Sequence, residues 1–363
     1  MLAAVAWGGH ELPVYPSYYP HEIAIETVPP ERAAGLLAES KIQAYVGGAP
    51  RFPGDVPASL RTVESLGGFV IVRLNSAAAS DSASACAALD ATVRGMAGQS
   101  GFVFHPYPVT PFHGDYLFHA DLAAAATARY RNVPADTAAW AQLKVKAEGA
   151  LRSLVSPDAL AAASEWDAAI EEVPAADLVA GAMTSVDGWL GPPWLKAGWF
   201  HAARMLGSAL DDAEAKARAD ALVARLEASE YRDAVERINL ERELVEILAG
   251  SCRERVAGYT VKREYFSAEF TDGVENIGFD SIAGLNSPMF VRTVKLKDFP
   301  WNGWLALGIE QAPAAAWNPI AGFDDPFGRL LWSAVGDPAL LPSPYDSGWM
   351  LNRISDVQPS GRR

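Results

Sequence analysis

The stretch Gly68-Phe-Val-Ile-Val-Arg-Leu74 is the strongest strand signal in the sequence. Its short apolar run, rich in β-branched side chains, is typical of a strand that is buried on both faces. Helices are expected on either side of it, at 30–39 and 82–96, and a further strand is expected at 102–105. Strands that alternate with helices over short connections build one sheet, so the sequence predicts an α/β fold.

Outward from this strand, the chain of 363 residues divides into three expected regions. An α/β lobe is expected over 1–132, where a polar, proline-containing break follows. The region 133–254 is mainly helical by composition, and a helix is expected at 230–249 with an apolar stripe that includes Val235, Ile238 and Val245. The region 255–363 has a period of two at 291–299 and then becomes rich in Gly, Pro and Trp, so an irregular region with some β structure is expected to pack on both others. This length exceeds one compact core, which predicts a two-lobed molecule.

Charge and hydropathy exclude two classes of partner. The formal net charge is -14, whereas a protein that binds nucleic acid without sequence preference needs clustered Lys and Arg. No stretch approaches the ~18 uninterrupted apolar residues that a membrane-spanning helix requires. We therefore expect no nucleic-acid partner and no membrane span.

Two features bear on the compartment. Ala4-Val5-Ala6, before Trp7, has the small-x-small form that precedes signal-peptide cleavage, which predicts a periplasmic or otherwise extracytoplasmic protein. The alternative is that residues 2–7 form an ordinary first strand. Cys86 and Cys252 are the two cysteines, and they either form a disulfide in an oxidising compartment or are two separate buried thiols.

The segment that follows the 102–105 strand concentrates the chemistry, because three of the six histidines fall within fifteen positions. A helix is expected to begin at Thr110, which would place Asp115 and His119, four residues apart, on one face. His113 would lie in the first turn, where the helix dipole favours the neutral ring that a metal ion requires. One hypothesis is therefore a metal site for zinc, copper or iron. Its ligands would be His105, His113, Asp115 and His119.

Two other interpretations of the same segment remain open. The histidine rings could cap turns or bond backbone carbonyls in a Tyr- and Pro-rich loop. Alternatively, the loop could hydrogen-bond a polar or anionic solute, together with an aromatic loop near the N-terminus. The residues expected to bind that solute are Tyr15, Tyr18, His21, His105, Tyr107, Thr110, His113 and Tyr116.

A family resemblance follows from the segment 30–48. A helix over Pro30 to Glu39 leads into Ser40-Lys-Ile-Gln-Ala-Tyr-Val-Gly-Gly48, which resembles the first lobe of type 2 periplasmic solute-binding proteins. The resemblance implies a two-lobed α/β fold with a ligand in the cleft between the lobes.

Two functions are therefore expected from different classes. The first is an exported binding protein that captures a small polar or anionic solute in an interlobe cleft and passes it to a membrane transporter. The alternative is a transition-metal-binding or redox accessory protein with its own redox partner. No GxSxG motif is present, and we assign no catalytic residue.

Overall fold

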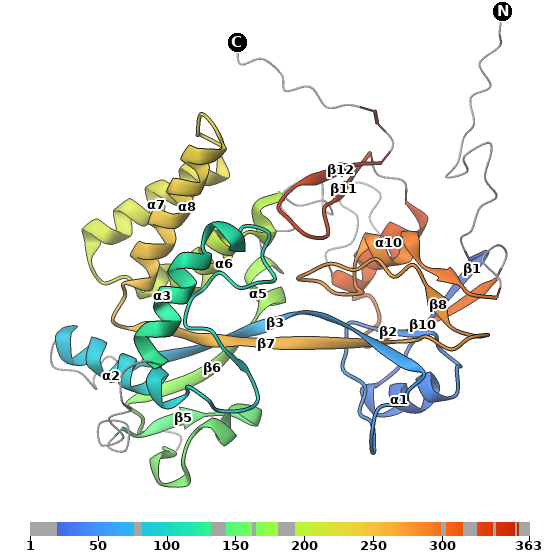
Figure 1. Ribbon diagram of the computed structural model, residues 1–363, viewed down its shortest axis with the longest axis horizontal. Helices are drawn as coiled ribbons and strands as arrows, with labels where there is room; N and C mark the ends of the chain where they lie inside the picture. The colour runs from blue at the N-terminus through green and yellow to red at the C-terminus, as the bar shows by residue number, and fades with distance from the viewer. Residues whose placement is uncertain are drawn as a thin grey trace, which may run out of the picture.

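The computed structural model describes residues 20–75, 82–131, 143–161, 165–180, 193–298, 303–314, 325–336, 339–352 and 354–355. These residues form a mixed α/β structure with two lobes (Figure 1). An eight-stranded sheet runs through both lobes in the order β1-β10-β2-β7-β3-β6-β5, and β4 also pairs with β7. The expected fold class is confirmed.

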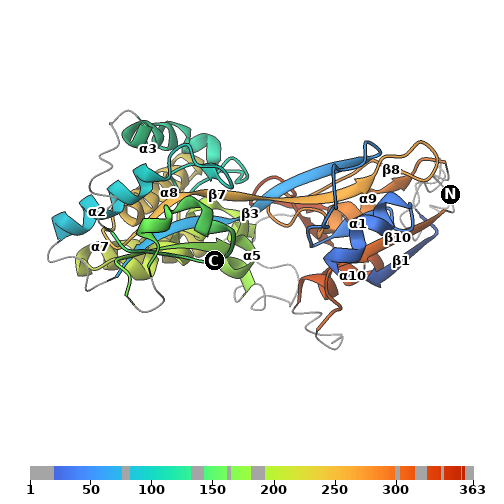
Figure 2. The same cartoon turned by 90° about the horizontal axis from the view of Figure 1, so that it is seen from below.

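Two long antiparallel strands join the lobes, β3 (Leu60–Leu74) and β7 (Glu254–Ser267). Seen from below, they bridge a narrow waist between the lobes (Figure 2). Their pairing shifts register between Leu66 and Gly68, and such an irregularity bends a strand and increases its twist. The waist is therefore a strand pair that continues into both lobes.

Alternate residues of β3 face two different cores, as the apolar run predicts. Phe69 and Ile71 pack in one core with helical residues from 195–248, whereas Val70 and Val72 pack in a second core with residues of α2, β5 and β6. The strands expected at 68–74 and 102–105 belong to the same sheet. Both predictions are confirmed.

The lobe on the right of Figure 1 combines the two ends of the described chain. β10 lies between β1 and β2 and is parallel to both. The elements of this lobe are β1 (Glu22–Thr27), α1 (Pro30–Ala38), β2 (Ala44–Val46), β8 (Val274–Glu275), α9 (Pro288–Thr293), β9 (Lys295–Leu296), β10 (Trp304–Ile309) and α10 (Pro326–Val335). The hairpin of β11 (Leu340–Pro342) and β12 (Trp349–Leu351) lies near the junction of the lobes.

The lobe on the left of Figure 1 carries most of the helices. Its elements are α2 (Ser82–Gly95), β4 (Val103–Phe104), η1 (Tyr116–Phe118), α3 (Ala120–Arg131), β5 (Val145–Ala147), η2 (Gly149–Leu154), η3 (Pro157–Ala159), β6 (Ala168–Pro174), α5 (Ala175–Ala180), η4 (Pro193–Lys196), α6 (Gly198–Leu206), η5 (Gly207–Ala209), α7 (Ala213–Glu227) and α8 (Ala234–Ala249). All three regions expected from the sequence contribute strands to the one sheet, and their boundaries at 132 and 254 stay a prediction.

Three local expectations were wrong. The helix expected from Thr110 begins only at Ala120, after a series of turns and η1. The strand expected at 291–299 starts as α9, because the Ser287 side chain caps that helix and proline occupies its first turn. The last sixty residues, expected to be irregular with some β structure, contain the strand β10 and also a helix that was not expected, α10. The apolar run of β10 finds its partners in strands near the other end of the chain.

Cys86 of α2 and Cys252, just before β7, form a disulfide, so the structure resolves the alternatives that the sequence left open. The bond joins α2 to the strand on which it packs. Among the described residues, no helix has both the length and the apolar character needed to cross a bilayer.

Candidate functional site

The histidine-rich loop leaves β4 and is fixed by backbone contacts at both ends. The His105 N–H donates to the Ala257 carbonyl of β7, and the His113 N–H donates to the Thr110 carbonyl in a turn. Gly114 lies against another part of the chain, since a Cβ atom built on it would be 2.6 Å from Asp346 Cα. These contacts hold the loop between the sheet and the β11–β12 connection.

His113 forms a buried pair with His201 of α6. His113 Nε2 lies 3.1 Å from His201 Nδ1, while His113 Nδ1 accepts from the Thr110 N–H at 2.9 Å and His201 Nε2 donates to the Leu195 carbonyl at 2.9 Å. Burial lowers the pKa of both rings to about 3, so both are neutral at physiological pH. Both ring nitrogens of His113 are thus engaged within the protein.

His105 also serves the loop itself. Its Nε2 donates to the Val109 carbonyl at 2.9 Å, and burial lowers the pKa of the ring. His105 and Tyr116 line a shallow surface pocket of about 360 Å³ beside α3. His113 and His119 are 3% and 0% exposed, so the structure places these two rings beneath the surface.

Asp115, His119 and Glu241 form a separate buried cluster, with one potential ligand atom from each within 4.8 Å of the others. Asp115 precedes η1, His119 follows it, and Glu241 projects from α8. Burial raises the pKa of Glu241 to about 7 and also raises the pKa of Asp115, while it lowers the pKa of His119. The environment therefore opposes negative charge on the carboxylates and positive charge on the ring.

The predicted metal ligands are thus only partly brought together. The structure joins Asp115 and His119, as their spacing predicts, but through a 3₁₀ turn and not within a regular helix. His105 and His113 form other hydrogen bonds and lie outside this cluster. Thr110 supports His113, and Tyr107 contacts His119 through its hydroxyl group at 2.8 Å.

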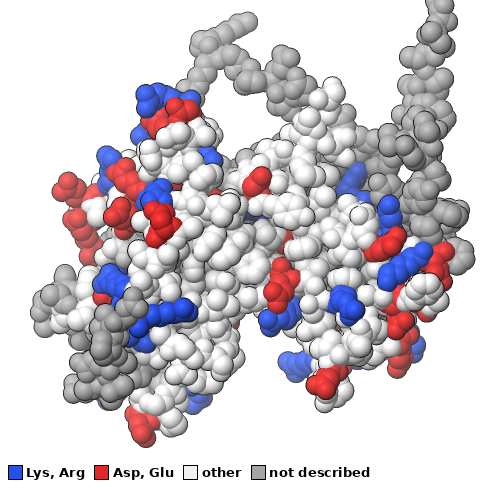
Figure 3. Space-filling view, viewed as in Figure 1, with Lys and Arg blue, Asp and Glu red and all other residues white. Residues whose placement is uncertain are grey.

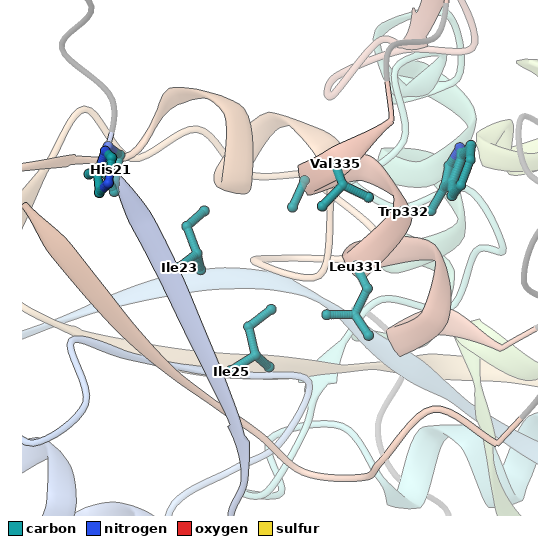
Figure 4. A pocket seen from close by; sticks show the side chains of 8 residues that line it. His21, Ile23, Ile25, Leu331, Trp332 and Val335 are labelled. Atoms are coloured by element: carbon teal, nitrogen blue, oxygen red, sulfur yellow. The ribbon is translucent and has the colours of Figure 1, made fainter. Parts of the chain in front are cut away.

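His21 lies in the other lobe and is not near the histidine-rich loop. It is exposed at the start of β1, beside a pocket of about 530 Å³ between β1 and α10. The labelled neighbours are apolar or aromatic, as Figure 4 shows: Ile23, Ile25, Leu331, Trp332 and Val335. This surface does not match the polar environment expected for the solute. Tyr15 and Tyr18 lie outside the described residues.

The junction of the lobes has polar contacts that the sequence did not reveal. Lys196, at the end of η4, forms an ion pair with Asp280 and also donates to the Ser343 carbonyl. The side chains of Lys196 and Asp280 are 16% and 8% exposed. Nearby, the Leu66 N–H of β3 donates to the Ser281 carbonyl at 3.0 Å. Segments from both lobes are therefore connected beside the waist.

Glu241 was missed although the sequence contained a signal for it. The apolar stripe expected along the 230–249 helix includes Ile238 and Val245, and Glu241 falls between them at helical spacing. A carboxylate on the apolar face of a helix is buried when that face packs against the core. Glu241 is buried in this way, since it is 1% exposed. Val235, expected on that stripe, is instead 67% exposed.

Comparisons with known proteins leave the site to be interpreted from its own chemistry. No protein-family model and no curated protein matches the chain. A solved structure of HbpA2 from Haemophilus parasuis is similar over 73% of this chain and 52% of that chain, at 12% identity and a TM-score of 0.37. The likeness thus spans about half the length of that protein, and at this TM-score it carries no conclusion on fold or function.

Proposed function

We propose that the protein is an exported binding protein that captures a small polar or anionic solute between its two lobes. The observation that carries this proposal is the waist: two continuous strands join the lobes, and a largely buried ion pair between Lys196 and Asp280 connects them beside it. A strand pair of this kind can bend, while a polar contact between lobes can form or break with a ligand.

The surface and the disulfide agree with this role. On the face seen in Figure 3, acidic and basic side chains are interspersed over both lobes, and the outline is notched between the lobes at its lower edge. A disulfide persists in oxidising compartments, which supports the extracytoplasmic location. The resemblance of the 30–48 segment to type 2 periplasmic solute-binding proteins points the same way, and a membrane transporter would then receive the solute.

Lys196 is the residue that we assign to an anionic group of the solute. It is a cation on one lobe whose partners, Asp280 and the Ser343 carbonyl, come from a distant part of the chain. A carboxylate or phosphate that enters the junction could compete with Asp280 for this ammonium group, because charge-assisted hydrogen bonds are among the stronger polar contacts.

The test combines thermal denaturation with small-angle X-ray scattering. Amino acids, dipeptides, dicarboxylic acids and sugar phosphates are screened against the wild-type protein. At a hundredfold excess over its Kd, a true ligand stabilises the fold by about 2.7 kcal/mol and raises the Tm. It should also change the radius of gyration, and Lys196→Met should weaken binding of an anionic ligand at least tenfold.

The matched control is Lys144→Met, which removes an exposed lysine paired with Glu165 and should leave binding unchanged. The proposal is rejected if no solute class raises the Tm and the scattering profile is the same throughout.

A further inference from the structure

The buried cluster of Asp115, His119 and Glu241 has polar atoms that the fold leaves unused. Among the described residues, His119 Nε2 and Glu241 Oε2 have no hydrogen-bond partner, although both atoms are fully buried. An unpaired buried polar atom costs about 1–3 kcal/mol, and native structures contain few of them. Two within one cluster indicate that a further group belongs there.

The other atoms of the same three side chains are held in place. Tyr107 Oη lies 2.8 Å from His119 Nδ1, Arg237 donates to Glu241 Oε1 at 2.7 Å, and the Gly198 N–H donates to the Asp115 carboxylate. When His119 Nδ1 donates to the tyrosine, Nε2 carries the lone pair that a metal ion needs. Metal ligands are oriented in this way by outer hydrogen bonds.

The charge of the cluster points to a cation. The carboxylates of Asp115 and Glu241 belong to residues that are 6% and 1% exposed. Among the described residues, the cation that pairs with them is Arg237, which contacts Glu241 Oε1. The nearby Arg242 pairs with Asp121 instead. Burial of carboxylates without compensating charge is unfavourable, and a divalent ion between them would remove that cost.

We propose that Asp115, His119 and Glu241 bind a divalent transition-metal ion of the zinc class. One imidazole and two carboxylates match zinc, and the imidazole disfavours magnesium and calcium, which prefer oxygen ligands. Tetrahedral coordination by these three side chains and one water, with bonds of about 2.0–2.2 Å, would place ligand atoms roughly 3.4 Å apart. The three side-chain atoms lie within 4.8 Å of one another, so they would move closer together on binding.

The ion would have a structural role within one lobe. Its ligands join the end of the histidine-rich loop to α8, and all three side chains are buried. This proposal does not depend on solute binding at the lobe junction.

The test is metal analysis of protein that is purified without chelator and without a histidine tag, followed by chelation and titration with zinc alone. We expect one equivalent of zinc per chain and a higher Tm for the zinc-loaded protein. Glu241→Gln and His119→Gln should weaken zinc binding at least a hundredfold and remove the rise in Tm. Tyr107→Phe, which removes an outer hydrogen bond, should weaken it about 10–100-fold.

Glu243→Gln is the matched control, because Glu243 is on the same helix but pairs with Arg218 at the surface. It should bind zinc like the wild type. Glu241→Gln keeps the shape of the side chain and removes a buried charge, and circular dichroism confirms that each variant is folded. Substoichiometric zinc in the reloaded wild type, or equal zinc affinity in Glu241→Gln and Glu243→Gln, would overturn the proposal.

Discussion

Replacement of both disulfide cysteines by alanine should remove a large part of the stability of the lobe that contains α2. The bond links Cys86 to Cys252 across 166 positions. In the chain-entropy description, cross-linking restricts the unfolded chain by an entropy that grows with the logarithm of the loop length. A loop of this size corresponds to about 17 cal/mol/K, or about 5 kcal/mol at 25 °C.

The assay is urea denaturation followed by circular dichroism, with the oxidised wild type, the reduced wild type and the double alanine variant compared. We expect the urea concentration at the midpoint of unfolding to be lower in the double alanine variant and in the reduced wild type than in the oxidised wild type. The urea dependence should become steeper, because an unfolded chain without the cross-link exposes more surface. A thiol assay of the unfolded, non-reduced wild type should find no free cysteine.

Two results would refute this reasoning. One is the recovery of two free thiols from the native protein. The other is a double alanine variant whose free energy of unfolding stays within 1 kcal/mol of that of the wild type, since the expected loss from the missing cross-link is about 5 kcal/mol. Single variants provide an internal check, because either one alone breaks the same bond.

Three further predictions test other contacts. His201→Gln should flatten the acid side of the pH–stability curve. The His201 ring has a pKa of about 3 in the folded protein, so as the pH falls below 6.5 protons bind the unfolded chain first, and this lowers the free energy of unfolding of the wild type by about 2 kcal/mol at pH 5. Urea denaturation at pH 7.5 and pH 5 measures this loss, and an equal loss in His201→Gln would contradict the prediction. Lys196→Met breaks a largely buried ion pair and should lower the free energy of unfolding by about 3 kcal/mol in urea denaturation. Lys144→Met breaks an exposed pair and should lower it by less than about 1 kcal/mol, so equal effects of the two changes would show that the Lys196 pair is not buried. Gly114→Ala should lower the Tm because the new Cβ meets backbone, while Gly35→Ala, on an open face of α1, should stabilise by about 1 kcal/mol; a stable Gly114→Ala protein would show that the loop is not held there.

Much of the sheet could be predicted from the sequence because its signals are local. The apolar run at 69–72 requires burial on both faces, and Pro30 with Glu31 marks the first turn of α1, whatever the partners of these segments are. The position of β10 could not be predicted in this way. Its place between β1 and β2 depends on pairing with strands more than 250 residues away.

The candidate site was harder to predict, because the partners of its side chains come from distant elements. Asp115 and His119 were recognised from their spacing, but Glu241 is supplied by α8. His113 was predicted to be a metal ligand, but its Nε2 instead contacts His201. This partner lies 88 positions away in the sequence, so local spacing could not reveal it. Sequence spacing describes which residues share a local face, whereas the hydrogen-bond partner of a buried ring depends on tertiary packing.

The histidines that cluster in the sequence therefore differ in role, and the difference lies in the hydrogen-bond partners of their ring nitrogens. His105 and His113 donate to or accept from groups that the fold would otherwise leave unpaired, and burial keeps both rings neutral. A neutral imidazole suits this task because it offers one donor and one acceptor in a rigid ring. His119 differs, since one nitrogen contacts Tyr107 and the other has no partner among the described residues. An added ion would displace an existing hydrogen bond of His113, whose two nitrogens are both engaged, whereas His119 Nε2 can bind an ion without such a loss.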